Sequence, residues 1–89
     1  MKFISKFVSK MPTVLRISGY VFSFYSNEGN ELPHVHVGKA DAEGKIWLEP
    51  EIEIEFFIGF NQKEKKRIME IVKEHSENFI QQWYEYFKK

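Results

Sequence analysis

Between residues 13 and 58 the chain alternates apolar and polar side chains with a period of two, which is typical of β-strands. The pattern predicts four to five short strands, within residues 14–18, 20–26, 33–37, 45–49 and 51–58. In the last of these, we expect the three glutamates to face solvent and the apolar residues Ile52, Ile54 and Phe56 to face the core. Because the intervening turns are short, the strands are predicted to form an antiparallel sheet in meander order.

From residue 61 onward the period changes to that of an α-helix. Asn61 is a favourable N-cap, and Glu64 three residues later completes a capping-box pattern. Apolar and aromatic positions then recur every three or four residues on one stripe, formed by Ile68, Val72, His75, Phe79, Trp83 and Tyr86. The fold class is therefore predicted to be α+β, with a long C-terminal amphipathic helix packed on one face of the sheet. We expect a bend near Ser76, or C-terminal aromatic residues that reach beyond the sheet edge.

The 89-residue chain contains no internal repeat, which predicts one domain at residues 11–89 after an N-terminal extension at residues 1–10. The extension places Phe3, Ile4, Phe7 and Val8 at helical spacing, as in a short amphipathic helix. Several strands carry bulky apolar groups on both faces, and one helix can cover only one face. Either the extension docks on the other face or two chains pair there, and a homodimer is the expected arrangement.

Charge is balanced but segregated along the chain. The 13 basic and 13 acidic residues cancel, yet residues 28–55 contain eight acids and only two lysines. The overall balance argues against strong nonspecific binding to nucleic acid, whereas the acidic centre suits a basic partner or a cation. The sequence has no cysteine, which excludes disulfides and thiolate chemistry. It also has no apolar run long enough to span a membrane and no secretory signal, so a cytoplasmic location is expected.

The run Pro33-His34-Val35-His36-Val37 is the most distinctive chemical feature of the sequence. In a strand, both imidazoles lie on one face and both valines on the other. If the valines face the helix, the histidines become a displayed pair, able to serve as proton donors and acceptors or to contact an anionic partner. We expect His75, on the apolar stripe of the helix, to be partly buried and separate from this pair.

A metal site would require more ligands than two histidines. Glu53, Glu55 or Glu28 on neighbouring segments could supply a carboxylate, and Glu53 is the candidate chosen here together with His34 and His36. No cofactor is expected, and a bound metal is the lesser alternative. Three basic residues near the helix start, Lys63, Lys66 and Arg67, are candidate binding residues for an acidic partner or a phosphate, with a solvated face as the simpler interpretation.

Several segments of the chain occur in the same order in a known bacterial family. They are Met11-Pro12-Thr13-Val14, Gly19-Tyr20, Phe24-Tyr25-Ser26, Pro33-His34-Val35-His36-Val37, Ile46-Trp47-Leu48 and Trp83-Tyr84-Glu85-Tyr86-Phe87. Over about residues 11–87 the chain resembles the domain-of-unknown-function 4160 family, although Leu32 replaces a proline that is frequent in members. The resemblance implies a small bacterial cytosolic protein, often encoded beside another small domain in toxin–antitoxin-like pairs, and it supplies no catalytic residues.

Three functional hypotheses follow. The leading one is a noncatalytic protein-interaction module, whose partner is a small protein encoded nearby. The second is a toxin-like ribonuclease that uses His34 and His36 for acid–base catalysis, with the basic helix start holding phosphate. The third is a metal-dependent activity at the same histidines. The sequence has no phosphate-binding loop, dinucleotide fingerprint or zinc-protease motif, so it leaves open whether the chain is an enzyme.

Overall fold

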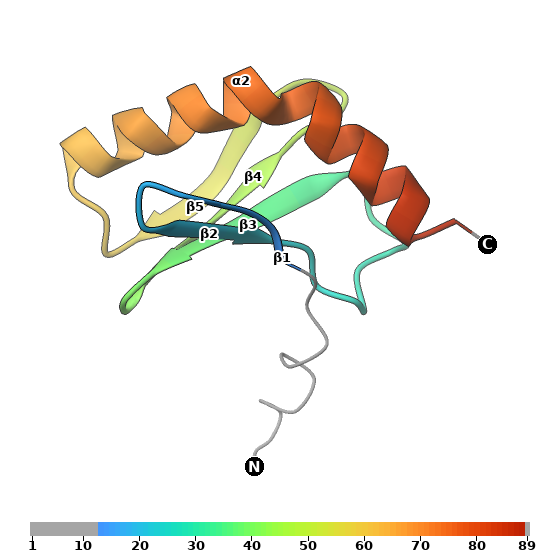
Figure 1. The fold of residues 1–89 in the computed structure, drawn as a ribbon, viewed down its shortest axis with the longest axis horizontal. Coiled ribbons are helices and arrows are strands. Elements are labelled where there is room, and N and C mark those ends of the chain that lie inside the picture. The colour runs from blue at the N-terminus through green and yellow to red at the C-terminus, as the bar shows by residue number, and fades with distance from the viewer. Residues whose placement is uncertain (1–12, 89) are drawn as a thin grey trace, which may run out of the picture.

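The computed structural model describes residues 13–88 as one antiparallel sheet crossed by one helix (Figure 1). The predicted extension at residues 1–10 lies outside the described residues. The elements are β1 (Thr13–Ile17), β2 (Tyr20–Ser23), β3 (His34–Lys39), β4 (Ala42–Trp47), β5 (Glu53–Ile58) and α2 (Gln62–Tyr86). The sheet order is β1-β2-β3-β4-β5, with every neighbouring pair antiparallel. The predicted α+β meander is therefore confirmed. Within residues 13–88, no helix has both the length and the apolar character needed to cross a membrane.

The core lies between the sheet and α2. From the helix it receives Ile68, Ile71, Val72, Phe79 and Trp83, and from the sheet side mainly Phe22, Phe24, Val35, Val37 and Ile46, all buried. The predicted capping box is present, since the Glu64 amide donates to the Asn61 side chain at 2.8 Å and the Asn61 amide donates to the Glu64 carboxylate at 2.9 Å. The first four backbone N–H groups of a helix have no acceptor within the helix, and a capping box supplies an acceptor to two of them.

Strand β5 departs from the predicted alternation. Ile46 is opposite Ile54, but the preceding Lys45 is opposite Phe56, so Glu55 is an extra residue in a β-bulge. After the bulge, the residues that would have faced the core face away from it, and those that would have faced away now face the core. Phe57 rather than Phe56 therefore packs against the core. The prediction that Phe56 points inward is therefore wrong. Ile54 also remains 47% exposed, because it lies on the edge strand of the sheet.

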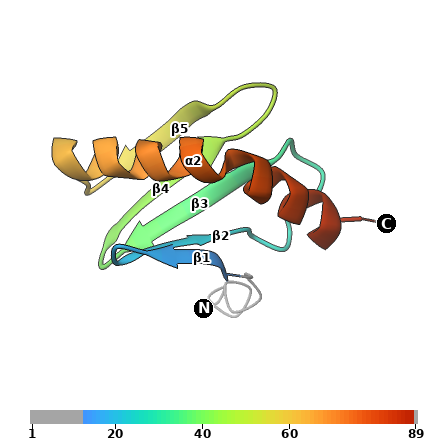
Figure 2. The same cartoon turned by 45° about the horizontal axis from the view of Figure 1, so that its top comes forward.

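The C-terminal half of α2 extends past the strands toward the loop that joins β2 to β3 (Figures 1 and 2). Trp83 packs edge-on against Phe24, with ring centroids 5.2 Å apart, and Phe87 lies 4.3 Å from the Trp83 ring. The expectation that the terminal aromatic residues reach beyond the sheet is thus confirmed. This contact brings the end of the helix to the residues that carry the candidate site.

Candidate functional site

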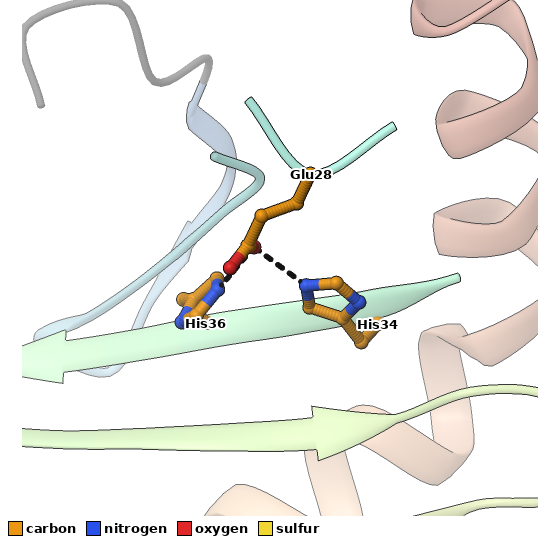
Figure 3. Close-up of side chains that lie close together, drawn as sticks. All are labelled: Glu28, His34 and His36. Atoms are coloured by element: carbon orange, nitrogen blue, oxygen red, sulfur yellow. Dashed lines mark hydrogen bonds and ion pairs between the residues drawn. The ribbon is translucent and has the colours of Figure 1, made fainter. Parts of the chain in front are cut away.

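Glu28, His34 and His36 converge on one point above β3 (Figure 3). The Nε2 atoms of His34 and His36 lie 2.7 Å and 2.8 Å from the same carboxylate oxygen, Oε1 of Glu28. One possible ligand atom from each of the three residues lies within 4.8 Å of the others. The structure thus joins the two predicted histidines to a carboxylate from the preceding loop.

Strand parity and two consecutive turns produce this arrangement. In β3, Val35 and Val37 belong to the core under α2, so the two histidines emerge on the opposite face of the sheet. The loop then folds back over that face. The Glu28 amide donates to the Tyr25 carbonyl and the Glu31 amide donates to the Glu28 carbonyl, both at 3.1 Å. These turns hold the Glu28 side chain above the strand that follows it in the sequence.

The expectation that the histidines are displayed to solvent is wrong. His34 is 0% exposed and His36 9% exposed, and the Glu28 side chain keeps only 17% of its accessible surface. The physical reason is that Tyr25 and Glu28, from the loop of residues 24–33, contact the histidine rings from outside the sheet, while Trp47 and Trp83 pack against His34. Both histidines are instead hydrogen-bonded to Glu28.

Aromatic rings enclose both imidazoles. The His34 ring lies 4.9 Å from the Trp47 ring and 4.8 Å from the Trp83 ring, so it contacts both β4 and α2. The His36 ring stacks on Tyr25, with centroids 3.6 Å apart and planes 7° from parallel. These contacts restrict both rings to orientations in which Nε2 points at Glu28.

The hydrogen bonds of His34 impose a condition on the cluster. Its Nδ1 lies 2.8 Å from the Leu32 carbonyl oxygen, which can only accept, so Nδ1 carries a hydrogen. In a neutral imidazole, Nε2 would then present a lone pair to the Glu28 oxygen 2.7 Å away. Two acceptors this close require a hydrogen or a cation between them, which is a second proton on the ring, a proton on the Glu28 carboxyl, or a bound cation.

Burial and hydrogen bonding act in opposite directions on the pKa values in the cluster. Burial alone would raise the pKa of Glu28, but its hydrogen bonds with both histidines and the charge of the imidazoles outweigh burial, so the pKa is lowered. For His36, burial dominates and lowers the pKa, although the contact with Glu28 acts to raise it. These directions favour an ionised Glu28 and a neutral His36 that donates Nε2–H at neutral pH.

Acidification is expected to destabilise the metal-free chain in two stages, so the measurement is made with a chelator present. Because the pKa of His36 is lowered from 6.5 on folding, the unfolded chain binds that proton more readily, and stability falls as pH drops below about 6.5. The lowered pKa of Glu28 adds stability that is lost as pH falls below about 4.5. Urea unfolding between pH 8 and 3 measures both stages. In the Glu28→Gln variant, the free energy of unfolding should depend less on pH below about pH 4.5. An unchanged pH dependence in that range would show that Glu28 is not the group responsible.

The end of α2 holds the Glu28 loop in place. The Phe87 ring packs against Gly29 so closely that a Cβ at residue 29 would lie 2.6 Å from Phe87 Cδ1. Gly29→Ala is therefore expected to lower the free energy of unfolding by about 1–2 kcal/mol through overpacking. Gly38→Ala is the matched control, because its added Cβ would meet only Ala42 O, at 3.8 Å. Equal stabilities of the two variants in urea unfolding would contradict the proposed packing.

The basic candidates lie away from the histidines. Lys39 ends β3 and contacts Glu64 at 3.7 Å, which places the helix start at the opposite end of β3 from His34. There an open hollow is lined by Ser18, Tyr20, Lys39, Asn61, Lys63, Glu64 and Arg67. Arg67 contacts Ser18 and Glu70, each at 3.5 Å, and Lys66 is exposed. The structure therefore does not bring Lys63, Lys66 or Arg67 to the histidine pair.

The other sequence candidates also lie outside the cluster. Glu53 is opposite Trp47 on β5, and it is not among the residues gathered around His34 and His36. His75 is half-buried on α2 and packs near Phe79, with ring centroids 6.0 Å apart, as its place on the apolar stripe predicts. The carboxylate that does join the histidines is Glu28. Its sequence signal is its position in a turn cluster just before the histidine strand.

Comparison with known proteins identifies the family. A family model described as Domain of unknown function (DUF4160) matches residues 19–84, a range that includes Glu28, His34, His36 and Trp83. Searches of curated proteins and of solved structures returned no match. Because the matched range spans most of the 89 residues, the chain belongs to the DUF4160 family, a family of domains whose function is unknown.

Proposed function

We propose that the chain is a noncatalytic protein-binding module that adds an extended, basic segment of a second small protein to the β5 edge of its sheet. The observation that carries the proposal is the pair of large apolar side chains exposed on this edge strand, Ile54 at 47% and Ile58 at 55%. A toxin–antitoxin-like pair, with the partner encoded nearby, is the setting that the family resemblance suggests.

The closed histidine cluster favours a noncatalytic role. A general acid or base must come within hydrogen-bond reach of its substrate. His34 is fully buried and both histidine Nε2 atoms are engaged by Glu28. The basic residues that would hold a phosphate lie at the other end of β3. A ribonuclease mechanism would need all of these groups at one accessible place.

The β5 edge offers backbone hydrogen bonds as well as apolar contacts. Among residues 13–88, strand β5 pairs only with β4, so the backbone groups on its other side can pair with an incoming strand. Ile54 is opposite the core residue Ile46, whereas Ile58 is opposite Glu43 on the other face. A strand added at this edge would cover apolar side chains on both faces, as in β-augmentation.

The acidic side chains on and beside β5 favour a partner segment that is basic. Glu51, Glu53 and Glu55 are all exposed on or beside β5. Charged side chains and a bulge are the devices by which edge strands resist pairing with copies of themselves. A second copy would bring the same acidic residues to the interface, whereas lysine or arginine side chains on a partner strand would neutralise them. This favours a different protein over the homodimer expected from the sequence.

Co-expression with the protein encoded by the neighbouring gene tests the proposal. The two proteins are expected to co-elute in size-exclusion chromatography with light scattering. The Ile54→Lys/Ile58→Lys double variant should weaken the complex at least about tenfold, since it replaces buried apolar contacts with positive charge facing a basic partner.

The control is a Leu32→Lys/Tyr84→Lys double variant, which removes two equally exposed apolar side chains away from β5. It should retain the complex. Separate elution of the two folded wild-type proteins at about 10 μM would contradict the proposal, because such pairs are expected to bind more tightly. A dimer of this chain that the β5 variant dissociates would show instead that the partner is a second copy.

A further inference from the structure

We propose that Glu28, His34 and His36 form a binding site for one divalent transition-metal ion that fastens the loop of residues 24–33 to β3. This site is independent of the proposed protein-binding edge, which lies on β5. The proposal rests on the convergence of three ligand atoms of suitable types, together with the orientation and burial of the groups that carry them.

The donor set points to a particular class of ion. Two imidazole nitrogens and one carboxylate oxygen suit ions such as Zn²⁺, Fe²⁺, Co²⁺ and Ni²⁺, whereas Mg²⁺ and Ca²⁺ prefer sites built from oxygen alone. Two histidines and one carboxylate arranged on one face are a known three-ligand site for such metals, with the other positions open. The ligands come from a strand and a separate loop, so a bound ion would cross-link the two.

The His34 ring is already oriented as a ligand. Its Nδ1–H donates to the Leu32 carbonyl at 2.8 Å, and metal-binding histidines typically make such a bond with the ring nitrogen that does not bind the metal. This bond places a hydrogen on Nδ1, so Nε2 directs a lone pair at Glu28 whenever the ring is neutral. A metal ion bound by Nε2 and the Glu28 oxygen would take the place of the proton that otherwise joins these two atoms.

Two of the three ligand pairs, each histidine Nε2 with the Glu28 Oε1, have a spacing closer to that of six-coordination than to that of four-coordination. Adjacent ligands of an octahedral ion with bonds of about 2.0–2.1 Å lie roughly 2.9 Å apart, and tetrahedral ligands about 3.4 Å apart. The two Nε2 to Oε1 distances are 2.7 Å and 2.8 Å. A small movement of the Glu28 loop would then admit an octahedral ion. Glu28 keeps some solvent exposure, so water can fill the remaining positions.

The surrounding charges permit a cation. Glu28 supplies one negative charge, and Glu31 lies 3.9 Å from Nδ1 of His34. Lys45 is the basic residue whose charge acts on His36, and it is engaged by Glu31 at 3.2 Å and lies over the Trp47 ring at 4.5 Å. The charge of Lys45 is therefore partly balanced by the Glu31 carboxylate.

Titration of the full chain with Co²⁺ tests the site. After removal of metals with a chelator, the wild type is expected to bind one Co²⁺ per chain in calorimetry, with an increase in Tm and the weak visible absorption of six-coordinate Co²⁺. Ring-nitrogen NMR with diamagnetic Zn²⁺ should shift the signals of His34 and His36 and leave those of His75 unchanged. Glu28→Gln and His36→Gln should each bind Co²⁺ at least about 100-fold more weakly.

Two controls separate this site from nonspecific binding. Glu31→Gln removes a neighbouring carboxylate and His75→Asn removes the remaining histidine, and both should bind Co²⁺ as the wild type does. Absence of binding to the folded wild type at 100 μM Co²⁺ and 100 μM Zn²⁺ would overturn the proposal. So would equal affinities of the Glu28→Gln and Glu31→Gln variants, or Zn²⁺-induced shifts confined to His75. The wild-type measurements remain decisive if a variant fails to fold.

Discussion

The Trp83→Ala variant is expected to have a free energy of unfolding about 3–5 kcal/mol below that of the wild type, the usual cost of removing a buried tryptophan. Trp83 is 2% exposed and contacts three structural units at once. Its ring packs on Phe24 after β2, on His34 at the start of β3, and on Phe87 at the end of α2. The loss is a large share of the roughly 5–15 kcal/mol that stabilises a typical domain.

Urea unfolding followed by circular dichroism measures this effect. Tyr84→Ala is the matched control, because Tyr84 is the next residue, is also aromatic and is 53% exposed. Its hydroxyl donates to Glu49 on the surface, so the control should lose no more than about 1 kcal/mol. Similar losses in the two variants would show that Trp83 does not anchor the helix end.

The Glu28→Ala variant, measured in chelator, is expected to lose about 2–4 kcal/mol of stability, because it leaves polar atoms of two buried histidines without a partner. Both histidine Nε2 atoms are hydrogen-bonded to Glu28, and His34 has no solvent access through which water could replace it. We also expect the loop of residues 24–33 to lose protection from hydrogen exchange, since its contact with β3 is broken.

Glu31→Ala provides the comparison for this variant. Glu31 belongs to the same loop, but its side chain is 41% exposed and its closest contact in the cluster, with Nδ1 of His34, is 3.9 Å. Its interaction with Lys45 at the surface is expected to contribute no more than about 1 kcal/mol. If the two glutamate variants were equally stable in urea, the hydrogen bonds of Glu28 would not stabilise the fold.

Trp83 and Glu28 belong to one continuous set of contacts. Phe87 packs against Gly29, and Trp83 packs against His34, so the end of α2 supports both the loop and the strand of the histidine cluster. The Trp83-Tyr84-Glu85-Tyr86-Phe87 segment and the Pro33-His34-Val35-His36-Val37 run are the two most distinctive segments of the sequence. The two segments are in contact in the folded chain through Trp83 and His34.

Local periodicity was sufficient to predict the elements of the fold. Alternation in the segment from residue 13 to 58 predicted the antiparallel meander, and Asn61 and Glu64 predicted the helix start, because these features depend only on near neighbours in the chain. The same parity placed Val35 and Val37 in the core and both histidines on the opposite face. The bulge at Glu55 was not predicted, since it depends on pairing with β4 and leaves no local pattern.

The identity of the histidines' partner was decided by tertiary structure. The sequence determined that His34 and His36 share a face and that carboxylates occur on neighbouring segments, but it favoured Glu53, and the structure shows Glu28 instead. The folding-back of residues 24–33, supported by Phe87 against Gly29, selected Glu28 and buried the pair. A loop's path depends on contacts with residues far along the chain, and periodicity within a strand carries no information about those contacts.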